Sequence, residues 1–342
     1  MIAAEAAVQR PLDAKLLVVD SQRNLIHVPR AAFVDFLRPN DVVIANDAAT
    51  LPASLKGIHQ QTGAPIEVRL AGRSSLDPLD VRRFSAVVFG EGDFHLRTED
   101  RPLPPCLHRG DTLLLGPLRA RVEQLLGHPR LVSLLFSGTI DEIWAGLARH
   151  GKPIQYSHMH DSLELWDVWT KIAGPPVAFE PPSAGFVLDW HILTTIRERQ
   201  ASFATITHAA GISSTGDDEL DQLLPFDEPF RIPETAARTV EVARKRGGRV
   251  IAVGTTVVRA LEAAATEDGH LRVGEGVAKG RIGPSTHLHV VDAILSGTHE
   301  PGTSHYELLR AFLEDSTLAR ATDELDSHGY RTHEFGDSVL IL

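Results

Sequence analysis

Two hydrophobic patterns divide the chain into a strand-rich stretch and flanking helix-rich stretches. Between residues 66 and 136, short apolar runs alternate with glycine, proline and aspartate turns, which is typical of closely spaced strands. We expect these strands at residues 66–70, 85–89, 94–98, 112–115, 120–124 and 131–136. Because no helical periodicity separates the runs, they predict a small antiparallel β-barrel.

Apolar residues outside this stretch recur at helical spacing or form short, fully apolar strands, as expected for a layered α/β domain. Strands are predicted at residues 16–19, 42–45, 204–207, 249–253 and 288–291, and helices at 33–37, 140–149, 192–199, 233–246 and 256–265. We therefore predict an α/β domain made of residues 1–64 and 150–342, interrupted by an inserted barrel domain at residues 65–149.

Residues 248–262 combine a buried strand, a glycine and a helix start. Gly254 follows the apolar strand, and Thr255 or Thr256 suits the N-cap of the helix that comes next. Backbone N–H groups and the positive dipole end of such a helix suit an anion. Arg259 and Glu262 lie three residues apart, so they are neighbours on this helix. On the pattern alone, an ordinary strand-to-helix turn is the simpler interpretation.

Composition narrows the class of protein. The 342 residues include one cysteine, Cys106, which excludes a disulfide framework and a zinc ribbon. The formal net charge is −11, which argues against sequence-independent phosphate binding, although arginine and lysine clusters could form a local basic groove. The first ten residues lack the features of a signal peptide, and no apolar run reaches membrane-spanning length. We expect a cytoplasmic protein without membrane contact, as a monomer or homodimer.

Two motifs connect the chain to a known family. Residues 252–262, Ala-Val-Gly-Thr-Thr-x-x-Arg-x-Leu-Glu, resemble the core motif of the S-adenosylmethionine:tRNA ribosyltransferase-isomerases of queuosine biosynthesis. Residues 330–341 resemble that family's Tyr-Arg-Phe-Phe-Ser-Tyr-Gly-Asp-Ala-Met-Leu-Ile. Weaker matches occur in order at residues 46–55, 180–186, 204–216, 224–233 and 299–301. The resemblance implies an α/β domain with an inserted small antiparallel β-barrel.

The resemblance also implies a reaction. Family enzymes move the ribosyl part of S-adenosylmethionine onto the aminomethyl group of a 7-deazaguanine base in tRNA, isomerise it to give epoxyqueuosine, and release adenine and methionine. S-adenosylmethionine is then the ribosyl donor substrate. No metal is implied, because the sulfonium already activates the adjacent carbon.

Candidate residues follow from the family reaction. His208 and His299 suit acid–base work because imidazole titrates near neutrality, and Glu228 or Asp337 suits an ammonium or hydroxyl group. We expect Thr255, Thr256 and Arg259 to bind the methionine carboxylate. The other candidates for ligand binding are Asn46, Asp47, Pro182, Ser183, Ala184, Gly185, Gly211 and Gly254.

Three alternatives remain open from the sequence. Ala49 and Ser54 stand where the family carries arginine, so the acceptor is either tRNA or another molecule, such as a small one. The same losses fit a relative that binds a nucleoside without catalysis. The pairs His158/His160 and His287/His289 are compatible with a metal-dependent hydrolase, since imidazoles two residues apart share one face of a strand.

Overall fold

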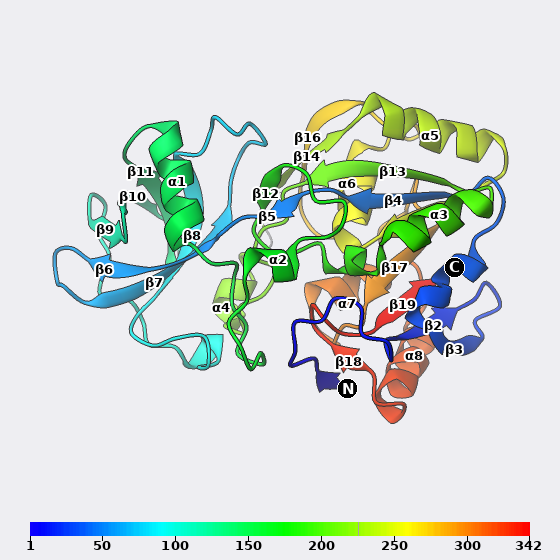
Figure 1. The fold of residues 1–342 in the computed structure, drawn as a ribbon, viewed down its shortest axis with the longest axis horizontal. Coiled ribbons are helices and arrows are strands. Elements are labelled where there is room, and N and C mark those ends of the chain that lie inside the picture. Colours follow the sequence, from blue (N-terminus) through cyan, green and yellow to red (C-terminus); the bar gives the residue numbers. More distant parts are fainter. Residues whose placement is uncertain (225) are drawn as a thin grey trace.

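The computed structural model describes residues 1–224 and 226–342, and its largest element is a mixed sheet (Figure 1). The strand order is β16-β14-β13-β4-β15-β17-β19-β2-β3. These strands are β2 (Lys15–Val19), β3 (Leu25–Pro29), β4 (Val42–Asn46), β13 (Ser202–His208), β14 (Glu228–Ile232), β15 (Val250–Val253), β16 (Gly274–Ala278), β17 (Ala293–Gly297) and β19 (Ser338–Ile341). At its centre, β13, β4, β15 and β17 run parallel, so their carboxyl ends meet at one edge.

Helices cover both faces of this sheet. Alternate residues of β4 show this directly: Val42 and Ile44 belong to one apolar core, while Val43 and Ala45 belong to another. The first core is covered by α5 (Glu234–Lys245), α6 (Thr255–Ala264), α7 (Ser304–Leu309) and α8 (Asp315–Ser327). The second is covered by α3 (Trp190–Glu198) and η1 (Arg30–Phe36). Burial on both faces explains why the central strands are continuously apolar.

The strand-rich stretch closes into the predicted barrel, on the left in Figure 1. Its strands pair in the order β10-β11-β8-β7-β6-β9. They are β6 (Ser54–His59), β7 (Pro65–Gly72), β8 (Arg83–Phe89), β9 (Thr112–Leu115), β10 (Leu118–Leu125) and β11 (Leu131–Phe136). The helix α1 (Ile140–His150) packs on the barrel through Ile143 and Leu147, and Thr139 begins it with a capping box.

The remaining elements are short. They are β1 (Ile2–Ala3), β5 (Ala49–Thr50), η2 (Thr98–Asp100), α2 (Leu165–Val168), β12 (Pro176–Ala178), η3 (Ser183–Val187), α4 (Asp218–Asp221) and β18 (Arg331–Thr332). The strand pairs β5–β12 and β1–β18 are separate parallel ribbons. No helix in the described part of the chain is both long and apolar enough to cross a membrane.

Two expected strands of the sequence analysis do not form. Residues 94–98 turn instead, because the Asp93 carboxylate accepts a hydrogen bond from the His95 N–H, and the barrel takes β6 as its remaining strand. The barrel therefore begins at Ser54, upstream of the boundary expected at residue 65. Residues 288–291 are also irregular, and the neighbouring strand β17 starts at Ala293.

The Glu262 side chain explains the second difference. Its carboxylate accepts hydrogen bonds from the N–H groups of His289, Val290 and Val291, at 2.7, 3.0 and 2.8 Å. Three backbone donors are thus satisfied by one side chain rather than by a neighbouring strand. The Glu262 carboxylate therefore binds backbone N–H groups and does not form an ion pair with Arg259.

Candidate active site

A cavity of about 740 Å³ opens at the carboxyl edge of the parallel strands, between the sheet and the barrel. Ligands of open α/β sheets bind at this edge. Loops after β13, β15 and β17 supply one side of the cavity, and Arg69 and Phe89 of the barrel supply another. The main lining segments are residues 154–158, 180–184, 210–216, 254–256, 296–300, 303–305 and 332–334.

The start of α6 faces this cavity as the sequence predicted, although the N-cap is Gly254 rather than a threonine. Gly254 has a φ of 95°, a conformation that residues with a side chain rarely adopt. The turn places Thr255 and Thr256 in the first turn of the helix and in the cavity wall. Free N–H groups and the positive dipole end of a ten-residue helix therefore face the ligand space.

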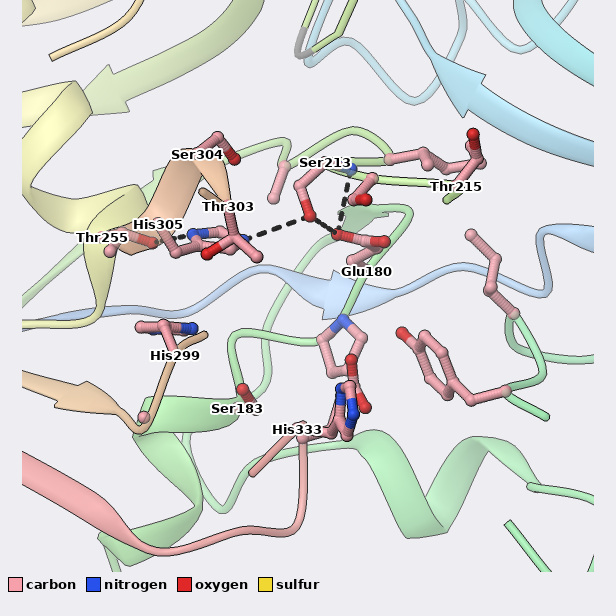
Figure 2. Close-up of a pocket in the computed structure, with 18 of the residues that line it drawn as sticks. Glu180, Ser183, Ser213, Thr215, Thr255, His299, Thr303, Ser304, His305 and His333 are labelled. Carbon is pink, nitrogen blue, oxygen red and sulfur yellow. Dashed lines mark hydrogen bonds between the residues drawn. The ribbon is translucent and has the colours of Figure 1, made fainter. Parts of the chain in front are cut away.

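A line of hydrogen bonds runs from this helix to a carboxyl group (Figure 2). The Thr255 hydroxyl lies 2.9 Å from His305 Nδ1, and His305 Nε2 lies 3.1 Å from Ser213 Oγ. Ser213 Oγ in turn donates to Glu180 Oε2 at 2.8 Å. One proton on His305 Nε2 satisfies all three bonds in a single direction. The cavity wall thus contains a continuous path along which a proton can be shared.

Glu180 is the titratable end of this line. Burial, opposed by the hydrogen bonds from Ser213 and assisted by the nearby Glu334 and Glu228 carboxylates, raises the pKa of Glu180 to about 8. Burial also lowers the pKa of His305 to about 4, with Arg259 contributing. At neutral pH, Glu180 is therefore mostly protonated and His305 is neutral.

Glu228 and Arg259 form a buried ion pair at the cavity. Arg259 Nη1 contacts Glu228 Oε2, and Glu228 Oε1 accepts a hydrogen bond from the Gly211 N–H at 2.6 Å. Burial raises the pKa of Glu228, and the Arg259 charge opposes this rise. The guanidinium also donates to the Gly280 carbonyl at 3.2 Å. Arg259 therefore lines the cavity, while some of its N–H groups are already bonded to Glu228 and to the Gly280 carbonyl.

Of the two histidines predicted for acid–base work, His299 lines the cavity and His208 does not. His299 lines the cavity, where its ring stacks on His305 with centroids 4.8 Å apart and its Nε2 lies 2.9 Å from Ser296 Oγ. Burial lowers the pKa of His299 well below its usual range, and His305 and His333 add to the effect. His208 lies behind Glu228, 3.3 Å from its Oε2, and burial lowers its pKa to about 3. Both imidazoles are therefore neutral at pH 7.

Five predicted site residues lie outside the cavity lining: His208, which lies behind Glu228, and four others that make structural contacts. Asp337 accepts hydrogen bonds from the N–H groups of Lys15 and Arg331, both at 2.8 Å. Asn46 bridges β4 to the backbone of His208 through its amide. Asp47 accepts from the hydroxyls of Thr205 and Thr207, and Gly185 is buried against Thr170. In contrast, Pro182, Ser183, Ala184 and Gly211 do line the cavity.

Several polar residues of the cavity were not singled out from the sequence. Glu180 directly precedes the Pro-Pro-Ser-Ala-Gly segment of residues 181–185, and Ser213 lies in the stretch of residues 204–216 that weakly matches the family. His305 carried no local signal, because only the fold brings it to this edge.

The two histidine pairs that suggested a hydrolase do not form metal sites of their own in the described residues. His160 turns to the surface and contacts Glu5, while His158 lines the cavity. The rings of His287 and His289 meet edge-on at 5.0 Å. Across residues 1–224 and 226–342, neither pair shares a three-residue cluster of metal-ligand type.

Comparisons with known proteins agree with this architecture. The profile of the family described as "Queuosine biosynthesis protein" matches residues 1–341. The S-adenosylmethionine:tRNA ribosyltransferase-isomerases of Trichlorobacter lovleyi and Geobacter sulfurreducens are each 30% identical over 350 residues, covering 100% of this chain and 96% of the relative. The crystal structure of S-adenosylmethionine tRNA ribosyltransferase from Thermotoga maritima matches with a TM-score of 0.52 and 22% identity, covering 100% of this chain and 96% of that one.

Proposed function

The chain belongs to the family of queuosine biosynthesis proteins, and on this premise we propose that it is an S-adenosylmethionine-dependent ribosyltransferase-isomerase. Its substrates are then S-adenosylmethionine and a 7-aminomethyl-7-deazaguanine base in tRNA, and its products are epoxyqueuosine in tRNA, adenine and methionine. We expect it in the cytoplasm, where this acceptor is found. The observation that supports the proposal best is the joining of a helix N-terminus and the Glu180 carboxyl group in one cavity of about 740 Å³.

The donor fits the cavity by its chemistry. The N–H groups and hydroxyls of Thr255 and Thr256 suit the methionine carboxylate, because the helix dipole adds a positive potential there. The turn at Pro182, Ser183 and Ala184 lines the cavity, and its small side chains suit the flat adenine. The ribosyl transfer needs no metal in this scheme, since the sulfonium itself activates the carbon beside it.

Glu180 is the residue we assign to proton transfer. The reaction needs a base near the activated ribose, and a carboxyl group with a pKa of about 8 is stronger as a base than an ordinary glutamate. The donor's sulfonium charge favours the ionised carboxylate, so binding lowers the pKa of Glu180. The line through Ser213 and His305 keeps the carboxyl group in place.

This assignment predicts a pH dependence. In the free enzyme, Glu180 becomes a carboxylate as pH rises through about 8, so kcat/KM should rise through that range and then level off. The kcat profile should level off at lower pH, because the bound sulfonium lowers the pKa of Glu180. Initial rates between pH 6 and pH 10 measure both profiles. Flat profiles across this range would contradict the role of Glu180.

The raised pKa of Glu180 also predicts that the stability of the fold depends on pH. The folded-state pKa of Glu180 lies above its unfolded value of about 4.5, so wild-type stability falls as pH rises from about 4.5 to about 8. Glu180→Gln removes the ionisation and should be more stable than wild type at pH 9, by about 2 to 4 kcal/mol. Thermal unfolding at pH 5 and pH 9 measures this, with the exposed Glu219→Gln as the matched control. Equal pH responses of wild type and Glu180→Gln would rule out the raised pKa.

At two positions that bear on the acceptor, the chain differs from the family. Ala49 and Ser54, where the family carries arginine, are buried, and Ser54 donates to Glu67 at 3.1 Å. With these cations missing and a net charge of −11, tRNA binding should be weaker and less salt-dependent than in a typical family member. Binding titrations at several salt concentrations measure the slope. A steep slope would show that other basic residues hold the tRNA, and a slope near zero would favour a small-molecule acceptor.

Release of adenine from S-adenosylmethionine tests the proposed function as a whole. A protein that binds the donor without releasing adenine would be a non-catalytic relative. Activity lost with a chelator and restored by metal would favour metal-dependent hydrolysis.

A further inference from the structure

Two histidines and a glutamate meet in the cavity wall, on the side away from Thr255. The rings of His158 and His333 stack with centroids 4.2 Å apart, and His158 Nε2 lies 3.6 Å from Glu334 Oε2. One ligand-type atom from each of the three residues lies within 4.8 Å of the others. Figure 2 shows His333 well separated from Thr255 and the start of α6. This group, the His158–His333–Glu334 cluster, forms none of the hydrogen bonds in the line from Thr255 to Glu180.

The cluster contains buried polar atoms without partners. His158 Nε2, Glu334 Oε2 and the hydroxyl of the adjacent Tyr156 are all buried and form no hydrogen bond to the described residues. Unsatisfied buried polar atoms are uncommon in folded proteins and indicate a missing partner such as an ion or water. Two of these atoms, His158 Nε2 and Glu334 Oε2, face each other at 3.6 Å, which is too far for a hydrogen bond and leaves room for an ion between them.

The local backbone holds this arrangement in place. His333 adopts a φ of 67°, and its carbonyl accepts a hydrogen bond from the Gly336 N–H at 3.0 Å, which closes a tight turn. A side chain at Gly336 would meet the Arg331 carbonyl at 2.4 Å, so the turn depends on glycine. In the motif that resembles the family, His333 and Glu334 stand where the family has phenylalanine and serine. These ligand-type side chains are therefore a feature of this chain rather than of that motif.

The donor set indicates the class of ligand. Two imidazoles and one carboxylate suit a divalent transition metal, whereas Mg²⁺ and Ca²⁺ prefer oxygen ligands alone. Two ligands about 2.1 Å from a tetrahedral Zn²⁺ are separated by about 3.4 Å, close to the 3.6 Å between His158 Nε2 and Glu334 Oε2. An imidazole binds a metal ion in the plane of its ring, so the His333 ring, which stacks on His158 at 15°, must turn out of this stack to join the ion. Three protein ligands leave one coordination position open, and the cluster lines the cavity, so this position faces the ligand space.

We propose that the His158–His333–Glu334 cluster binds one divalent transition metal ion of the Zn²⁺ type. The open position then takes a nitrogen or oxygen atom of a molecule held in the cavity. This site goes beyond the proposed ribosyl transfer, which does not use it. A second group of ligand type, His27 with Glu324 and His328, lies at the surface and must be separated from it in any binding measurement.

Zn²⁺ titration of metal-free protein, in competition with a chromophoric chelator, tests the proposal. The wild type should bind one equivalent, and His158→Ala, His333→Ala and Glu334→Gln should each weaken that binding more than about 100-fold, since they remove direct ligands. His328→Ala and His160→Ala should bind as wild type does. Far-ultraviolet circular dichroism confirms that each variant is folded, and Glu334→Gln keeps the side-chain volume.

Two results would overturn the site. One is a wild type that binds no Zn²⁺ in competition with the chelator. The other is binding that survives the three cluster substitutions or is lost only in His328→Ala, which would place the metal at the surface. Because the readout is metal binding, neither result decides whether S-adenosylmethionine is converted to adenine.

Discussion

The Glu180→Gln variant should bind S-adenosylmethionine and lose about 10²- to 10⁴-fold in kcat, the range for removing a general acid–base group. Glutamine keeps the size of the side chain and can still accept the hydrogen bond from Ser213, but it cannot take up a proton. The donor site at Thr255 and Thr256 is formed by another segment, so binding persists. Single-turnover adenine release measures kcat, and calorimetry measures donor affinity.

The control for this loss is Glu219→Gln, which replaces an exposed glutamate of α4 in the same way. Ser213→Ala should give a smaller loss, because it breaks the line to His305 while leaving the carboxyl group present. If Glu180→Gln turns over at the wild-type rate, the proton is transferred elsewhere and Glu180 has a structural role.

Arg259→Ala should lower the free energy of unfolding by about 3–5 kcal/mol, the range for breaking one side of a buried ion pair. The substitution leaves the Glu228 carboxylate buried, with Gly211 N–H as a remaining donor and His208 beside it. The double variant Arg259→Met, Glu228→Gln should recover most of the loss, because it leaves no uncompensated charge. Urea unfolding of the three proteins measures these differences.

The double variant also separates folding from ligand binding. If Arg259 contacts the donor carboxylate, the folded double variant should bind S-adenosylmethionine about 1.5–3 kcal/mol more weakly, the range for a charged hydrogen bond. Unchanged affinity in this variant would assign Arg259 to the ion pair with Glu228 alone. A single variant as stable as wild type would show that the pair is not a buried one in solution.

Local pattern was sufficient where neighbouring residues decide the structure. The apolar strand, the glycine and the helix of residues 249–264 were predicted because the burial and the turn are set within one segment. The failure at residues 288–291 has the opposite cause: Glu262, far away in sequence, takes the N–H groups that a strand partner would have used. Such side-chain-to-backbone bonds leave no periodic signal.

In the site, too, local pattern predicted some residues correctly, and contacts between distant residues decided the others. Thr255, Thr256 and the turn at 182–184 reach the cavity because strand ends and helix starts face that edge of the sheet. Asn46, Asp47 and Asp337 have the residue types of ligand-binding groups, yet each satisfies nearby backbone or hydroxyl donors. The raised pKa of Glu180 depends on its burial, and its hydrogen-bonded line depends on His305, more than a hundred residues away in the sequence. Neither the burial nor this contact can be predicted from the local sequence.

Adenine release from S-adenosylmethionine tests the central claim most directly. Wild-type protein, Glu180→Gln and Glu219→Gln are each incubated with the donor, with and without tRNA that carries the 7-aminomethyl-7-deazaguanine base, and adenine and modified tRNA are quantified. The account predicts that wild type and Glu219→Gln release adenine in step with tRNA modification, while Glu180→Gln does so at least about 100-fold more slowly. Wild-type protein that binds the donor and releases no adenine, with this tRNA or with the free base as acceptor, would contradict it.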